Sequence, residues 1–302
     1  MSPSRDKQSP PDLQTDWQQA LRSHPRAWQS NRYVYPVLSR RARGVSIGIN
    51  LCPDQVCNFQ CVYCQVDRSQ PARRRVVELT ILRNELDHML TQVASGELFR
   101  AEPFAGAPEH MRCLSDIAFS GDGEPTASEA FADAARIAVE ARQSHRLPAD
   151  MKIVVLTNAT LLDRPAVQAA LEMLHGHAGQ VWAKLDAGTE EHYRRVNRCP
   201  IPLQHIVDNI TLAARRWRVL IQSMWLRFGG RDPDPVEVDA FADRLRNILD
   251  AAGRIEAVQV YTLARRPAEP NVSPVPEEGL QAIADAVARR TGLPVEVYPS
   301  PA

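Results

Sequence analysis

The amino-acid sequence predicts an α/β protein built as a partial (βα)6-type TIM barrel with parallel strands. From residue 44 onward, short apolar runs of strand type alternate with longer amphipathic stretches of helix type. This alternation is typical of parallel strands joined by right-handed crossover helices. The length of 302 residues also suits a single α/β barrel.

The expected elements form six strand–helix units and a final strand. Strands are expected at residues 45–51, 116–120, 153–157, 181–185, 219–225, 257–262 and 295–298. Helices are expected between them, at residues 79–94, 128–144, 164–175, 203–216, 235–252 and 277–290. Ser128 followed by Glu129 favours a helix start, and Gly253 and Gly292 favour helix ends just before them.

Two regions of the chain are expected. Residues 1–43 are predicted to form an N-terminal extension that is partly disordered or helical, with a short helix at about residues 12–23. Residues 44–302 are predicted to form the core domain, because the strand–helix alternation begins there.

Composition excludes several classes of protein. The 36 basic and 36 acidic residues give a formal net charge of zero, so no global charge attracts nucleic acid or an anionic membrane. No apolar run approaches the roughly 20 residues that span a bilayer, and the N-terminus lacks the apolar segment of a signal peptide. We therefore expect a cytoplasmic protein. Six cysteines in that reducing compartment favour metal binding or catalysis over disulfides.

Polar residues share one face on several expected strands. Alternate side chains of a strand point the same way, so Trp182, Lys184 and Asp186 share a face, as do Gln259 and Tyr261. An ordinary barrel interior is filled with branched apolar residues, so these positions predict a lumen that holds a ligand. In such folds ligands bind at the C-terminal ends of the strands.

Three cysteines follow the first expected strand with the spacing Cys-x-x-x-Cys-x-x-Cys, at Cys57, Cys61 and Cys64. Three thiolates can hold three irons of a cubane cluster and leave the fourth iron open to an external ligand. A structural zinc site would need a fourth ligand, and Cys52 is the nearby candidate. The spacing favours the iron–sulfur cluster and leaves zinc as the alternative.

This loop, with the aromatic Tyr63 before its last cysteine, resembles the signature of the radical S-adenosylmethionine (SAM) superfamily. The resemblance covers about residues 44–298. It is strongest to the iron–sulfur proteins related to the tRNA wyosine-base synthase, through residues 119–126, 156–162 and 184–198. It implies a radical SAM core domain and an iron–sulfur enzyme whose cofactors are a [4Fe-4S] cluster and SAM.

The resemblance also implies which residues hold SAM. Segment 120–126, Ser-Gly-Asp-Gly-Glu-Pro-Thr, is similar to the segment that binds the methionine amino group, with Glu124 as its anionic acceptor. Lys184 would engage the methionine carboxylate or a substrate anion, and Asp186 the ribose hydroxyls. The alternative for Asp186 is a helix cap. The full set expected at SAM is Tyr63, Gly121, Asp122, Gly123, Glu124, Thr157, Asn158, Lys184, Asp186 and Tyr261.

The remaining cysteines suggest a second hypothesis. The wyosine enzyme carries another cluster on cysteines ahead of the radical triad, and no cysteine precedes Cys52 in this sequence. Cys52, Cys113 and Cys199 would instead be the ligands of any auxiliary cluster, although buried core cysteines are the simpler interpretation. Lys184 and Cys199 are the candidates for a catalytic residue.

The expected function is reductive cleavage of SAM to a 5′-deoxyadenosyl radical that abstracts hydrogen from an unidentified substrate. Flavodoxin or ferredoxin would supply the electron. A tRNA-modifying role stays open, since arginines cluster on the expected loops, although a solvated basic surface explains them too. A non-catalytic iron–sulfur or zinc protein is the other alternative. These arginines are Arg73–Arg75, Arg194, Arg195, Arg198, Arg265 and Arg266.

Overall fold

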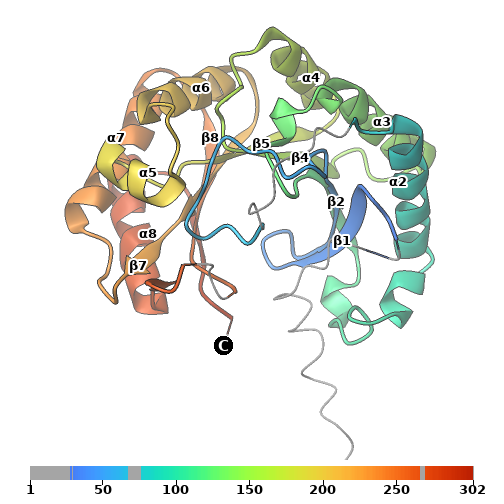
Figure 1. Cartoon of the computed structure of the whole chain (residues 1–302), viewed down its shortest axis with the longest axis horizontal. Helices are drawn as coiled ribbons and strands as arrows, with labels where there is room; N and C mark the ends of the chain where they lie inside the picture. The colour runs from blue at the N-terminus through green and yellow to red at the C-terminus, as the bar shows by residue number, and fades with distance from the viewer. Residues whose placement is uncertain (1–27, 29, 67–75, 266–268, 302) are drawn as a thin grey trace, which may run out of the picture.

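One curled β-sheet forms the frame of the described part of the protein (Figure 1). The computed structural model describes residues 28, 30–66, 76–265 and 269–301. The strands of this sheet are β1 (Val34–Ser39), β2 (Gly44–Ile49), β3 (Leu114–Phe119), β4 (Lys152–Thr157), β5 (Gly179–Lys184), β6 (Val219–Met224), β8 (Ile255–Tyr261) and β10 (Val295–Tyr298). They lie side by side in this order, with β1 antiparallel to β2 and every later pair of neighbours parallel.

Helices follow the strands and cover the outer face of the curled sheet (Figure 1). They are α2 (Leu79–Ala94), α3 (Phe131–Ser144), α4 (Pro165–His175), α5 (Glu190–Asn197), α6 (Leu203–Arg216), α7 (Pro235–Asp250) and α8 (Glu277–Thr291), with 3-10 turns η1 (Glu97–Arg100), η2 (Glu109–Met111) and η3 (Pro125–Ala127). Because each helical connection returns the chain to the same edge, the C-terminal ends of the parallel strands meet on one side. The predicted α/β half-barrel, with six strand–helix units and a final strand, is confirmed.

Several short elements were not expected from the sequence. Strands β7 (Leu226–Phe228) and β9 (Val272–Pro274) pair as a small antiparallel ribbon outside the main sheet. Helix α5 is mostly polar and begins where the Thr189 side chain accepts a hydrogen bond from the backbone of His192 at 3.2 Å. Helix α3 begins at Phe131 rather than at residue 128, because a turn at residues 128–130 separates it from η3. Such short or polar elements carry too little apolar periodicity to be recognised.

Strand β1 corrects the expected domain boundary. It lies within the predicted extension of residues 1–43, yet it pairs with β2 over its whole length, from Val34 opposite Ile49 to Ser39 opposite Gly44. Pro36 argues against a strand in the sequence, but proline is accepted in an edge strand. The core therefore includes β1. The helix expected at residues 12–23 lies outside the described residues.

The two faces of the sheet differ as the alternation predicts. Val181 and Ala183 are buried in the main hydrophobic core beneath the helices. Trp182, between them in sequence, belongs to a separate small cluster with Ala118, Val154 and Leu220 on the opposite, concave face. Polar residues surround this cluster, so the concave face leaves room for a ligand at the strand ends.

Candidate functional site

A cavity of about 350 Å³ opens at the C-terminal ends of the parallel strands, where the fold predicts a ligand. Its volume is within the range of small-molecule sites, about 300–1,000 Å³. The three cysteines of the triad line it together with all the predicted SAM residues except Asp186. Those residues are Tyr63, Gly121, Asp122, Gly123, Glu124, Thr157, Asn158, Lys184 and Tyr261.

The cysteine loop follows β2 and is held against the end of α5. The backbone nitrogens of Gln60 and Val62 donate to the carbonyls of Asn197 and Val196 at 2.9 Å each. Val62 and Val196 also belong to one small buried apolar cluster. The loop is therefore fixed by contacts with a segment far away in the sequence.

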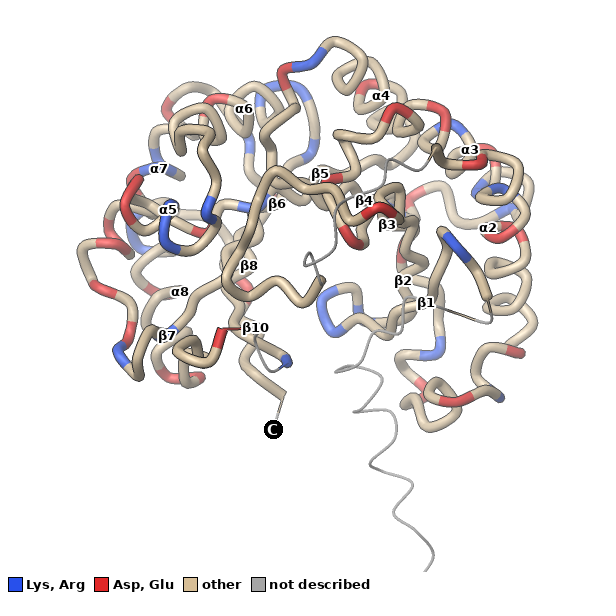
Figure 2. Tube along the Cα trace, viewed as in Figure 1, with Lys and Arg blue, Asp and Glu red and all other residues tan. Residues whose placement is uncertain are grey.

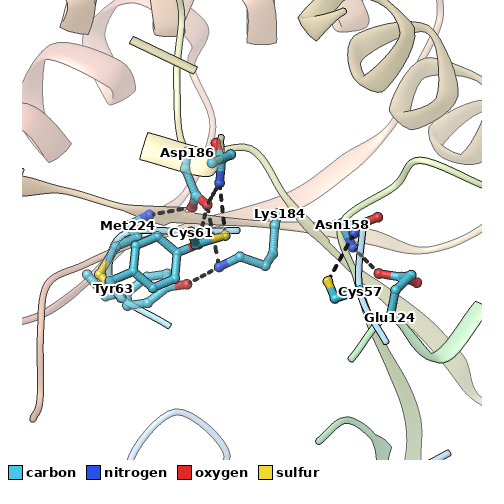
Figure 3. A network of polar contacts seen from close by, with 10 residues as sticks. Cys57, Cys61, Tyr63, Glu124, Asn158, Lys184, Asp186 and Met224 are labelled. Atoms are coloured by element: carbon cyan, nitrogen blue, oxygen red, sulfur yellow. Dashed lines mark hydrogen bonds and ion pairs between the residues drawn. The ribbon is translucent and has the colours of Figure 1, made fainter. Parts of the chain in front are cut away.

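Two buried amides face the sulfur atoms of the triad. Asn197 Nδ2 lies 3.4 Å from Cys61 Sγ, and Asn158 Nδ2 lies 3.8 Å from Cys57 Sγ (Figure 3). Burial raises the pKa of Cys61 to about 12, so this thiol stays neutral unless a cation such as iron binds it. Amide donors of this kind are suited to stabilise thiolate ligands.

The donor set fits a cluster better than a single ion. Within the described ranges, no three Cys, His, Asp or Glu side chains converge on a point that could hold one metal ion. A cubane does not need such convergence, because each cysteine binds its own iron. Cys52, the fourth ligand of the zinc alternative, is buried, and its thiol donates to the Glu124 carbonyl at 3.3 Å.

The Glu124 carboxylate is the most unusual acid of the cavity. It is 2% exposed and accepts hydrogen bonds from Thr126 and Thr157 on one oxygen, and from the backbone of Asn158, at 2.7 Å, on the other. No basic side chain of the described residues pairs with it, and burial raises the pKa of Glu124. A buried acid without a cation is stabilised by an ammonium ligand, so this site fits the amino group of SAM.

Glycines bring the Glu124 loop close to the cysteine loop. Gly121 has a φ of +136°, a conformation that favours glycine. A Cβ atom at Gly123 would overlap the carbonyl oxygen of Val56 in the cysteine loop. The second glycine is therefore required for the close packing of the two loops.

A second polar network lies at the ends of β5 and β8, separate from Glu124 (Figure 3). The Tyr63 hydroxyl donates to Asp186 Oδ2 at 2.5 Å, and Asn197 Nδ2 donates to the same oxygen at 2.9 Å. Lys184 Nζ lies 3.6 Å from that oxygen and donates to the Tyr261 hydroxyl at 2.9 Å. Burial alone would lower the pKa of Lys184, but Asp186 and Tyr261 raise it overall, so this lysine is a cation.

The structure places Asp186 behind the residues that line the cavity. Its carboxylate is buried and is not part of the cavity wall, and its Oδ1 accepts the backbone N–H of Met224 at 2.9 Å. Asp186 therefore holds Tyr63, Lys184 and Asn197 in place from behind the cavity wall, and its contact with ribose stays a prediction. The helix-cap alternative is wrong, because Thr189 caps α5.

Sequence reasoning missed several residues of the site. Asn197 joins Cys61 to Asp186, and no local pattern indicated it. Gln222 and Met224 line the cavity from β6, and the same alternation that pointed to Lys184 on β5 would have found them. Arg40 and Arg41 line the cavity from the β1–β2 turn, in a region expected to lie outside the core.

The remaining cysteines do not gather at the site. Cys113 is exposed and precedes β3, whereas Cys52 follows the adjacent parallel strand β2, so a strand length of roughly 20 Å separates them. Cys199 is 1% exposed, packs in the main core and is not part of the cavity wall. The structure therefore does not bring these three residues together as ligands of one auxiliary cluster, and a catalytic role for Cys199 stays a prediction.

Comparisons with known proteins give relatives of low identity. UPF0026 protein MJ1312 of Methanocaldococcus jannaschii is 28% identical over 163 residues, which is 54% of this chain and 43% of that protein. The chain spans less than half the length of the curated relatives it matches. These proteins supply no activity that can be transferred directly.

Solved structures share the fold. A radical SAM methyltransferase from Sphaerobacter thermophilus superposes with a TM-score of 0.58 at 16% identity, over 88% of this chain and 68% of that chain. TYW1 with a lysine–pyruvate adduct gives a TM-score of 0.51 at 14% identity, over 90% and 81%. At such identities the likeness shows a common half-barrel.

The fold and the thiol loop together define an iron–sulfur half-barrel protein. The family model of the radical SAM superfamily matches residues 53–242, more than half of the chain. The chain therefore belongs to the radical SAM superfamily, whose cofactors are a [4Fe-4S] cluster and SAM, and the predicted family and cofactors are confirmed.

No helix in the described ranges is both long enough and apolar enough to cross a membrane. The cytoplasmic location stays a prediction.

Proposed function

We propose that this protein is an enzyme that cleaves SAM reductively in the strand-end cavity and uses the product radical to remove hydrogen from a substrate. The observation that carries the proposal is the shared cavity. The triad of Cys57, Cys61 and Cys64 and the buried, uncompensated Glu124 carboxylate line the same space. A redox carrier or a zinc protein has no need for that carboxylate.

The protein residues have distinct roles in this proposal. When bound, the cluster and SAM supply a one-electron cleavage of a carbon–sulfur bond that yields methionine and a 5′-deoxyadenosyl radical. Cys57, Cys61 and Cys64 hold the irons, and Glu124 accepts the ammonium of the methionine moiety. Lys184, which lines the cavity as a cation, is suited to its carboxylate.

Lys184 is held in place by the residues around it. Its ammonium lies 4.9 Å from the centre of the Tyr63 ring and 5.6 Å from that of Tyr261. These contacts and Asp186 restrict the side chain to one position, so a ligand carboxylate meets a preorganised cation. The apolar concave cluster around Trp182 excludes water below it.

The electron donor and the substrate remain proposals. A flavodoxin or ferredoxin is the class of partner that supplies single electrons to such a cluster. The loop arginines give little support to tRNA as substrate, because Arg194 pairs with Glu190 at 2.7 Å and Arg198 with Glu269 at 2.8 Å. Arg73–Arg75 and Arg266 lie outside the described residues.

Anaerobic reconstitution tests the proposal. We expect about four irons per chain, an electron paramagnetic resonance signal that SAM alters, and 5′-deoxyadenosine after reduction with dithionite. Replacing Cys57, Cys61 and Cys64 with alanine should abolish all three. Cys113→Ala is the matched control, because Cys113 is exposed and remote from the cavity, and it should behave like the wild type.

The outcomes are distinct. Iron binding that survives loss of all three triad cysteines would refute the ligand assignment. A complete cluster that never forms 5′-deoxyadenosine with dithionite and SAM would leave an iron–sulfur protein and exclude the proposed reaction.

A further inference from the structure

The turn between β1 and β2 places two consecutive arginines in the cavity wall. Arg40 and Arg41 are both half-buried and both line the cavity. Figure 2 shows basic residues on this turn, at the open side of the half-barrel. Arg40 Nη1 donates to the carbonyl of Pro299, just after β10, at 2.8 Å, and the Arg41 guanidinium lies 5.0 Å from the centre of the Tyr261 ring. The turn thus reaches across to the opposite edge of the sheet.

Among the described residues, no carboxylate lies within ion-pair distance of these two charges, although Arg41 is near enough to Asp116 to lower the pKa of that acid. Neither arginine forms an ion pair with a carboxylate of the described residues, in contrast to Arg290, which binds Asp243 at 2.6 Å. Burial and then the charge of Arg41 lower the pKa of Arg40. Two adjacent guanidiniums that share a half-buried position repel each other, so a bound anion would stabilise them.

A third arginine approaches the same cavity from the other side. Arg265 lies in the segment after β8, lines the cavity and donates to Gln65 Oε1 at 2.7 Å. The other cation of the cavity wall, Lys184, is paired with Asp186. Two acids also line the cavity. Asp122 accepts a hydrogen bond from the Asn50 amide at 2.6 Å, and Glu124 is buried beside the cysteine loop. Positive charge is therefore concentrated at the open side.

We propose that Arg40 and Arg41, with Arg265 opposite, bind the phosphate group of a small phosphomonoester substrate. A phosphomonoester carries a charge of about −1.5 to −2 at pH 7, which matches two or three guanidiniums better than a single carboxylate does. Planar guanidinium forks also fit phosphate oxygens in a bidentate way. The proposal rests on the proposed function in one respect, since it takes the cavity for the active site.

The test measures binding rather than turnover. Ribose 5-phosphate, inorganic phosphate and ribose are titrated into the full-length, reconstituted protein with SAM present, by isothermal titration calorimetry at 0.15 M salt. We expect ribose 5-phosphate and phosphate to bind and ribose not to bind. Arg41→Gln should weaken ribose 5-phosphate binding by about tenfold or more, because it removes a charge-assisted contact and keeps the Arg40–Pro299 bond.

Two further variants make the result specific. Arg41→Lys keeps the positive charge but lacks the planar guanidinium that can donate two parallel hydrogen bonds to phosphate, so its affinity for ribose 5-phosphate should fall several-fold. Arg43→Gln is the matched control, because Arg43 is exposed in the same turn and does not line the cavity, and it should change affinity less than twofold. Near-ultraviolet circular dichroism of each variant checks that the fold is retained.

Three outcomes would overturn the proposal. The first is that Arg41→Gln and the wild type bind ribose 5-phosphate with equal affinity. The second is that Arg41→Gln loses affinity for SAM to the same extent as for ribose 5-phosphate. The third is that tRNA binds more tightly than ribose 5-phosphate and displaces it. The second would assign the arginine to the cofactor carboxylate, and the third would assign the site to a phosphodiester backbone. Because no step requires SAM cleavage, failure of the proposed reaction would be seen separately.

Discussion

At the scale of single residues, Glu124 is the carboxylate of the cavity that is suited to bind a ligand ammonium group. Its carboxylate is buried, and neutral donors alone face it among the described residues. Such an acid favours its protonated form until a cation arrives. A ligand ammonium would therefore gain a charge-assisted hydrogen bond that water cannot reach.

Glu124→Gln tests that role. The amide keeps the size of the side chain but removes the negative charge, so SAM affinity should fall by about tenfold or more while the melting temperature stays close to that of the wild type. Equilibrium dialysis with labelled SAM measures the affinity. Glu140→Gln, at a partly exposed residue paired with Arg83, is the control. Equal SAM affinity in Glu124→Gln and wild type would remove the acid from the cofactor site.

Asp116 gives a pH dependence at the other end of the lumen. It is buried in β3 beside Ser46, and burial raises the pKa of Asp116 to about 6, from about 4 in an unfolded chain. The folded state therefore binds the proton more tightly. This residue's contribution to stability is present in full below pH 4 and is lost as the pH rises through 6.

Asp116→Asn should remove this dependence. Between pH 7.5 and pH 5, the wild type should gain about 1 kcal/mol of unfolding free energy relative to the variant, because only the wild type has an acid at position 116 that takes up a proton on folding. Urea unfolding at the two pH values measures the difference. An unchanged difference between the two proteins would show that Asp116 titrates normally.

At the scale of elements, two loops from neighbouring strands form one unit. The glycine loop after β3 packs on the cysteine loop after β2, and the backbone of Glu124 donates to the Val56 carbonyl at 3.4 Å. Gly123 allows this approach because it has no Cβ. The geometry of the triad thus depends on a glycine outside it.

Gly123→Ala should disturb cluster assembly more than folding. The new methyl group would overlap the Val56 carbonyl and push the cysteine loop away, at a cost of about 1–3 kcal/mol. We expect the iron content after reconstitution to fall below half of the wild-type value. Gly176→Ala is the control, since a Cβ there makes an ordinary contact. A full iron content in Gly123→Ala would show that the loops adapt without loss.

At the scale of the whole molecule, β1 closes one edge of the half-barrel. Val34, Tyr35 and Leu38 are buried to at least 95%, and the Tyr35 ring covers Gly48 in β2. The same strand leads into the turn that carries Arg40 and Arg41. The edge strand therefore serves both the core and the cavity.

Two truncations test the position of the core boundary. Removal of residues 1–43 deletes β1 and should destabilise the protein by several kcal/mol, a large part of the usual total of 5–15 kcal/mol. Removal of residues 1–27 keeps β1 and should leave a folded protein. Thermal unfolding followed by circular dichroism compares them. Equal melting temperatures for the two truncated proteins would show that the core begins at residue 44 and does not need β1.

Most of the barrel was predictable because its signals are local. Each parallel strand carries an apolar run of its own, and helices such as Leu79–Ala94 and Leu203–Arg216 show a full amphipathic period. Strand β1 was not predictable, because Pro36 weakens its pattern and pairing with β2 alone makes it a strand. Helix α5 was missed because most of its surface is polar.

The sequence by itself determined the half-barrel, the cysteine loop and the glycine loop, since periodicity and spacing act within short segments. Only the tertiary structure decided how these parts meet. It places the Asn197 amide beside the Cys61 sulfur and holds the Asp186 carboxylate against the backbone of Met224. It also packs Cys199 in the main core. It also brought Arg40 to the cavity. Such contacts depend on how the sheet curls and which loops then touch, and no local pattern encodes that.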